Sequence, residues 1–289
     1  MLSWQLLITL FLFLSTASVL LRRYLATTLA AHNQIINAVF YVGILYPLAL
    51  LVTALSPAPI HISGLNLLLL FIGEWLFPFS LVLSFRASRQ IDAGSYTIIG
   101  NLTPIVTIIT AWTLLNEGLS GYKFIGAVII ILSAFIVTLP KLRAHKIDKN
   151  SGLMLALVAS ILLGLAITFE RFMLTRMNLE SYLVFGWGFQ TLWMVLIAWP
   201  KRRELSILRD RKKLYYIVGY GLSFALGGLC FVSALKLSGN VSVISSIISF
   251  RTVLVVLAAL IFLREKEWLW LKIGAALVGT AGLIILSRS

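Results

Sequence analysis

Two residues with ionisable side chains stand in the middle of long apolar segments. Glu74 lies at least ten residues from either end of segment 64–85, and Arg251 lies ten residues from the start of segment 241–263. Ten helical residues span about 15 Å, and a charge that far from water costs several kcal/mol unless it is paired, protonated or facing a wet cavity. We predict that Glu74 and Arg251 share one central cavity and pair there, directly or through water. A substrate anion or a proton could then separate them.

Other polar residues accompany Glu74. Trp75 and Pro78 follow it closely, and Pro78 has no N–H to bond the Glu74 carbonyl. Gln190 is a second deep polar group, in segment 182–200. We therefore treat Trp75 and Gln190 as further candidates for substrate binding or coupling. Glu170, near the end of segment 151–173, is instead expected to reach the membrane surface.

A polar stripe runs along segment 93–115. Thr97, Asn101 and Pro104 fall within about 60° of arc on one helix face. The stripe is either a wall of a transport path or a set of small residues that lets helices approach closely. Segment 241–263 carries counterparts of these residues, namely Ser245, Ser249 and Thr252. Arg251 points about 200° away from Ser249, and we give Arg251 the preference as a site residue.

The composition indicates a polytopic membrane protein. Apolar residues make up 60% of the 289, charged residues only 12%, and the mean hydropathy is +0.99. A helix needs about 20 apolar residues to cross the hydrocarbon layer. Ten stretches qualify, five in each half: 3–21, 33–55, 64–85, 93–115, 121–140, 151–173, 182–200, 214–235, 241–263 and 268–287.

The chain repeats itself. The stretch from Ala93 to Pro140 recurs, 148 positions later, as the stretch from Val241 to Arg288. We predict an all-α fold of two five-helix repeats, residues 1–148 and 149–289. An odd number of spans inverts the second repeat in the membrane, which is the architecture of alternating-access transporters with a site between the halves.

The net charge of +14 is spread over short loops. Eighteen Lys and Arg residues fall on one predicted side of the membrane and five on the other, so the positive-inside rule places both termini outside. The basic loop at 200–213 is expected to touch anionic lipid, not nucleic acid. A scaffold that presents this loop and transports nothing is the alternative function.

Neither a metal, a cofactor nor an enzyme activity is predicted. The three histidines are scattered, Cys230 is alone, and no span or loop collects a nucleophile with a base.

The loops between the fourth and fifth predicted spans of the two repeats lie in the sequences LLNEGLSG and FLREKEWL. Each loop is followed by a glycine-containing apolar helix. With Pro104 in the preceding span, this pattern resembles the EamA-type permeases of the drug/metabolite transporter superfamily. The resemblance implies a ten-helix secondary transporter of the inner or plasma membrane, an exporter or exchanger of small metabolites such as amino acids. It also implies a structural role for Glu117 and Glu265, and both termini inside, against the charge count. Arg251 replaces the Thr103 of the first repeat, so an anionic or phosphorylated substrate held by Arg251 is the alternative cargo.

Overall fold

A computed structural model describes the chain from residue 3 to 287 with gaps. The described parts are residues 3–29, 33–115, 151–238, 250–263 and 269–287, with isolated helical positions between 121 and 136 and at 244 and 248. Every element within these parts is helical. Ser249, Glu117 and Glu265 lie outside the described residues.

The first half begins with one unbroken helix, α1 (Trp4–Thr28). The next three segments are each built from two or three helical pieces: α2 (Asn33–Phe40), the π-helix η2 (Tyr41–Leu45) and α3 (Tyr46–Ala54); α4 (Gly64–Gly73) and α5 (Leu76–Gln90); α6 (Ala93–Gly100) and α7 (Leu102–Leu115).

The second half also begins with an unbroken helix. The unbroken α9 (Ser151–Arg176) comes first, and the later elements are α10 (Leu179–Ser181), the π-helix η4 (Tyr182–Gly186), α11 (Trp187–Ala198), the 3-10 helix η5 (Trp199–Arg209), α12 (Arg211–Ser238), α14 (Phe250–Ala258), the π-helix η6 (Ala259–Leu263) and α15 (Leu269–Ser287).

Within the described residues, seven helical segments are long and apolar enough to cross a membrane, so the chain is a multi-pass membrane protein. They agree with seven of the predicted spans, namely 3–21, 33–55, 64–85, 93–115, 151–173, 182–200 and 214–235. Two shorter apolar helices, Arg251–Leu263 and Leu269–Gly282, fall within predicted spans 241–263 and 268–287. Most of predicted span 121–140 lies outside the described residues. The count of ten therefore stays a prediction.

Side chains that accept from backbone N–H groups begin several helices. Ser3, Ser63, Asp92 and Asn178 each accept from the backbone N–H three residues later, which satisfies a donor that the first helical turn leaves open. Proline ends helices inside two spans: α4 stops just before Glu74, four residues ahead of Pro78, and α6 stops at Gly100, four residues ahead of Pro104. Both breaks bring polar residues into the middle of a span.

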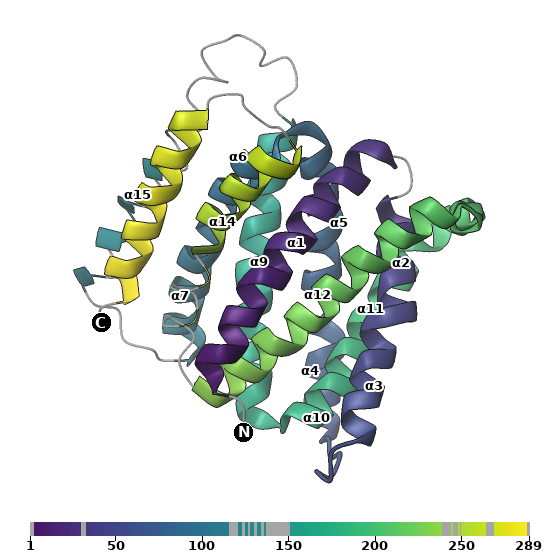
Figure 1. The fold of residues 1–289 in the computed structure, drawn as a ribbon. Helices are drawn as coiled ribbons and strands as arrows, with labels where there is room; N and C mark the ends of the chain where they lie inside the picture. Colours follow the sequence, from purple (N-terminus) through teal and green to yellow (C-terminus); the bar gives the residue numbers. More distant parts are fainter. Residues whose placement is uncertain are drawn as a thin grey trace.

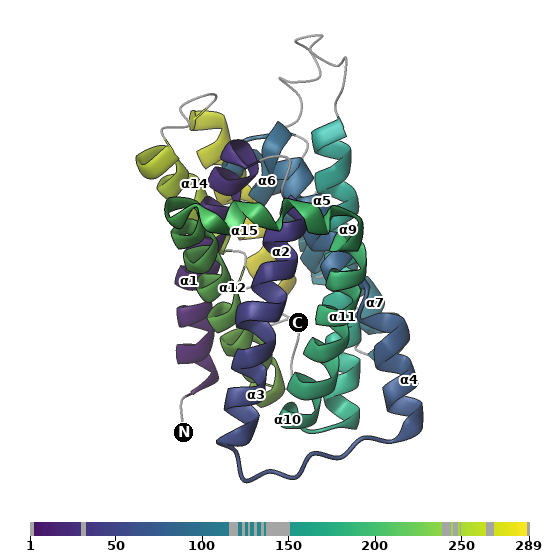
Figure 2. The same ribbon diagram turned by 90° about the vertical axis from the view of Figure 1, so that its right-hand side faces the viewer.

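The two halves pack against each other along their length. In Figure 1, α1 and α12 lie side by side, and α9 lies against α5 and α7. The first helix of each half runs in the opposite direction from the other, since α1 rises in this view and α9 descends. Figure 2 shows the connection from α3 to α4 crossing below the helices, where Asn178 donates to the Pro59 carbonyl and the His61 N–H donates to Ser181.

The contact of α7 with α9 depends on small and hydroxylated residues. Thr103 Oγ1 donates to the Ser160 carbonyl at 3.1 Å, and Thr107 Oγ1 donates to the Gly164 carbonyl at 3.3 Å. A Cβ added at Gly164 would lie 2.7 Å from the Val106 side chain. Close approach of two backbones with hydroxyl bonds across them is typical of helix pairs in membranes.

Candidate functional site

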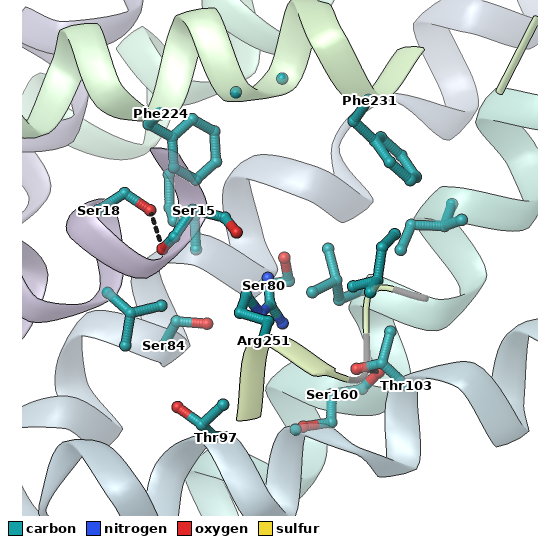
Figure 3. A pocket seen from close by; sticks show the side chains of 18 of the residues that line it. Ser15, Ser18, Ser80, Ser84, Thr97, Thr103, Ser160, Phe224, Phe231 and Arg251 are labelled. Atoms are coloured by element: carbon teal, nitrogen blue, oxygen red, sulfur yellow. Dashed lines mark hydrogen bonds between the residues drawn. The ribbon is translucent and has the colours of Figure 1, made fainter. Parts of the chain in front are cut away.

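A cavity of about 150 Å³ lies between the two halves of the chain. Its walls come from α1, α5, α6 and α7 of the first half and from α9, α12 and α14 of the second. Aromatic side chains line the α12 side, where Phe224 and Phe231 face the cavity (Figure 3). The opposite walls carry serine and threonine residues.

Arg251 extends from α14 into the middle of this cavity, toward Ser80 of α5 (Figure 3). No hydrogen bond or ion pair joins its guanidinium group to another described residue. The prediction that Arg251 lines a central cavity agrees with its place in the structure, although a function for this residue stays a prediction.

A second arginine, Arg22 of α1, lines the same cavity. It is buried, 7% exposed, and its guanidinium carbon lies 4.3 Å from the centre of the Tyr96 ring. Its Nε and Nη2 atoms are buried without a hydrogen-bond partner among the described residues. Arg22 and Arg251 are close enough to influence each other electrostatically, so the cavity holds two cations that no described carboxylate neutralises.

Serines on α1 and α5 supply most of the polar wall. Ser15, Ser18 and Arg22 follow one another at helical spacing, as do Ser80 and Ser84, and all five face the cavity. None of these five residues was predicted as a site residue from the sequence. The signal that could have indicated them is the spacing of three and four residues between polar positions in an apolar span.

Most of these hydroxyl protons are already used within the protein. Ser15 donates to the Leu12 carbonyl and Ser80 to the Phe77 carbonyl. Ser84 differs, because its Oγ accepts from the Tyr96 hydroxyl at 2.7 Å and no described acceptor takes its own proton. Ser84, Arg22 and Arg251 therefore present donors to the cavity.

The predicted polar stripe also reaches the cavity. Thr97, Asn101 and Pro104 all line it, and Asn101 lies at the break between α6 and α7. Thr252 Oγ1 donates to Asn101 Oδ1 at 2.6 Å, which joins the stripe of the first half to α14. The Thr97 hydroxyl donates to the Ala93 carbonyl.

The predicted pairing of Glu74 with Arg251 is wrong. Glu74 does not line the cavity, and no ion pair joins it to Arg251. Its Oε2 instead accepts from Gln190 Nε2 of α11 at 2.6 Å. The chain breaks between α4 and α5 at Glu74, and this break directs the carboxyl group toward α11. Trp75, the next residue, is 38% exposed, packs its ring near Phe79 and does not line the cavity.

Glu170 corrects a second expectation. It is 2% exposed and lies beside Glu74, which is 3% exposed, although we expected Glu170 at the membrane surface. The reason is that α9 continues to Arg176, so Glu170 is well inside the helix. Tyr182 of η4 contacts both carboxyl groups, and Tyr41 of η2 faces them as well. Among the described residues, neither carboxyl group forms an ion pair with a lysine or an arginine.

Comparison with protein families matches residues 150–288 to the EamA-like transporter family. The match covers most of the second half of the chain, which we call the EamA-like half. The matched residues of the EamA-like half run from α9 to α15 and include Arg251, Gln190 and Glu170. A search of curated proteins finds no match to the chain. The EamA-like half indicates a membrane transporter of a small molecule in a lipid environment, not an enzyme. Among the described residues no group of three His, Cys, Asp or Glu side chains could hold a metal ion.

Proposed function

We propose that this chain is a secondary transporter, an exporter or exchanger, of a small polar metabolite that carries an anionic group. The observation that carries the proposal is the pair of arginines, Arg22 and Arg251, in a cavity lined by both halves. An amino acid, an organic acid or a phosphorylated metabolite would supply the anion. The inner or plasma membrane is the proposed location.

The charge balance of the cavity favours an anion. A guanidinium group held away from water needs a carboxylate, an anion or water, and no described carboxylate meets either arginine. Guanidinium groups bind carboxylate and phosphate through two parallel hydrogen bonds. Arg22, Arg251 and the Ser84 hydroxyl together place three donor groups around the cavity. Phe224 and Phe231 offer an apolar wall to the rest of the substrate.

The helix arrangement supports alternating access of residues 1–148 and 149–289. The opposite directions of α1 and α9 are those of an inverted repeat, and the cavity lies where the two halves meet. The broken helices at Glu74 and Asn101 resemble the discontinuous helices that flank substrate sites in transporters. Ten spans complete this proposed architecture.

The experiment is exchange of labelled solutes in proteoliposomes that contain the purified protein. Vesicles loaded in turn with amino acids, organic acids, phosphorylated metabolites and amines are tested for uptake of the same external solute. We expect exchange of an anionic or zwitterionic solute but not of a simple amine. Exchange of amines alone, or of none of these solutes, would overturn the proposal.

Charge-removing variants locate the site. Arg22→Gln and Arg251→Gln should each raise the KM for the anionic solute, with a further increase in the double variant. Arg202→Gln is the control, because Arg202 is exposed on η5, outside the residues that line the cavity, and its guanidinium group packs on Trp199. An unchanged KM in both cavity variants would exclude the arginines as the binding groups.

A scaffold that binds anionic lipid is the second candidate function. Trp199, 59% exposed, stacks under Arg202, and the exposed residues Lys201 and Arg203 lie beside them. Exposed tryptophan next to basic residues is typical of the membrane interface and of contact with anionic headgroups. Replacing the three basic residues by glutamine separates the functions: a transporter keeps its exchange activity, whereas a pure scaffold loses its only interaction.

A further inference from the structure

We propose that Glu74 and Glu170, with Tyr182 and Gln190, form a proton-binding site that is separate from the substrate cavity. The site binds one proton between its two carboxyl groups and exchanges it with water as the helices move. Coupling of this proton to the substrate rests on the proposed transport function; the binding of the proton itself does not.

The hydrogen bonds of this cluster are incomplete. Gln190 donates to one oxygen of Glu74, but Glu74 Oε1 and Glu170 Oε2 are buried without a hydrogen-bond partner. The Tyr182 hydroxyl lies beside both carboxyl groups, fully buried, and has only one proton to donate between them. A carboxyl group that holds a proton gains a donor, whereas two ionised carboxylates offer only acceptors. One bound proton therefore supplies a donor between the two carboxyl groups, in addition to the donors of Gln190 and Tyr182.

The electrostatics lead to the same result. Glu74 and Glu170 are close enough to repel each other when both are charged. Among the described residues, the other titratable groups facing them are Tyr182 of η4 and Tyr41 of η2, and Tyr220 of α12 faces Tyr41 in turn. None of these is a cation at any physiological pH. Two adjacent carboxylates without a cation cannot both remain ionised at low cost, so a proton takes the place of the missing cation.

The same helices carry the acid pair and the cavity wall. Glu74 lies at the α4–α5 break, and α5 continues to Ser80 and Ser84 in the cavity. Glu170 lies on α9, which carries Ser160 to the opposite wall. A change in the number of protons on the pair alters the attraction between α5 and α9. The protonation state of the pair thereby affects the position of the cavity walls, although neither carboxyl group contacts the substrate.

The local backbone is suited to such a movement. Tyr182 and Tyr41 both lie in π-helical turns, which are frequent at functional sites. Gly73, next to Glu74, packs so tightly on Phe169, next to Glu170, that an added Cβ would lie 2.3 Å from the Phe169 ring. The pair is thus held at a point where α4 packs tightly against α9.

Infrared difference spectroscopy of the protein in nanodiscs tests proton binding directly. A protonated carboxyl has a C=O stretching band that an ionised carboxylate lacks. We expect this band to disappear as the pH is raised, to be lost in the double variant Glu74→Gln/Glu170→Gln, and to shift in frequency in Tyr182→Phe. Glu180→Gln is the matched control and should leave the band unchanged, because Glu180 lies outside the cluster and accepts from Ser56.

Three results would overturn the proton site. These are a pH-dependent band that survives in the double variant, no protonated band in the wild type, or a band that persists unchanged at every pH at which the protein stays folded. Size-exclusion profiles establish folding of each variant. If the double variant aggregates, the same C=O stretching band is measured in Glu74→Gln, Glu170→Gln and Tyr182→Phe. A band that is unchanged in all three variants then overturns the proton site.

The coupling is tested in proteoliposomes with a pH gradient. We expect the wild type to accumulate or expel its substrate in response to the gradient. The Glu74→Gln and Glu170→Gln variants should keep substrate exchange at equal pH but lose the response to the gradient. A gradient response that survives in both variants excludes the pair as the coupling site. Absence of exchange in the wild type contradicts the proposed transport function, and the infrared result then stands on its own.

Discussion

Thr252 Oγ1 and Asn101 Oδ1 are joined by a hydrogen bond of 2.6 Å that connects α14 of the second half to the α6–α7 break of the first. Both residues are buried, and Asn101 also lines the cavity. The residue next to Thr252 is Arg251, which projects into the same cavity. This bond therefore fixes the position of the helix that carries the central arginine.

Replacing Thr252 with valine should destabilise the protein by about 1–3 kcal/mol, because a buried amide oxygen loses its donor. The thermal unfolding midpoint in detergent measures this effect. Thr280→Val is the control, since Thr280 is also buried but donates only to the Ala276 carbonyl of its own helix. Equal destabilisation of the two variants would show that the bond between the halves contributes no more to stability than a hydroxyl bond within one helix.

Gly73→Ala should cost about 1–3 kcal/mol of stability, because its new methyl group overlaps the Phe169 ring. Phe169→Leu in the same chain should restore part of the loss by making space. Gly43→Ala is the matched control, since a Cβ at Gly43 meets nothing within 4 Å. Thermal unfolding of the three variants and of the wild type gives the comparison. Failure of Phe169→Leu to rescue Gly73→Ala would mean that the overlap is relieved in some other way.

Lys272 Nζ and Asp92 Oδ1 form an ion pair of 3.1 Å between the starts of α15 and α6. Both side chains are largely buried, so Lys272→Met should cost up to about 3–5 kcal/mol by removing the cation beside the Asp92 carboxylate, which keeps its hydrogen bonds from Ser95. Asp92→Asn with Lys272→Met should cost less than the sum of the single changes. Chemical or thermal unfolding of the double-mutant cycle measures the coupling, and strict additivity would contradict it.

The orientation in the membrane follows from the charge distribution. We expect both termini on the outside, so a reporter that fluoresces only in the cytoplasm should stay dark when fused after Ser289. Arg22 and Lys272, counted with the basic loops, are buried in the structure and carry less weight in this argument. A bright fusion would place the termini inside, as the resemblance to EamA-type permeases implies.

Hydropathy, periodicity and proline placement determined much of this protein from the sequence alone. Seven of the predicted spans are confirmed as candidate membrane helices because the need to satisfy backbone groups within a segment is local and leaves its mark on about 20 consecutive residues. The breaks near Glu74 and Asn101 follow from Pro78 and Pro104, again local causes. The position of Thr97, Asn101 and Pro104 on one face follows from helical geometry, and all three line the cavity.

The partner of each buried polar group was decided only by the tertiary structure. The depth of Glu74 and Arg251 in their spans indicated that each needs a polar partner. Glu74 accepts from Gln190, which is 116 positions away, and Arg251 lines the same cavity as Arg22. Such choices depend on how each helix is rotated about its axis and on which helix packs beside it. These are set by the summed packing of many apolar side chains, and no single spacing in the sequence records them. Glu170 became part of the acid pair for the same reason, since α9 continues beyond its expected end and turns that carboxyl group toward Glu74.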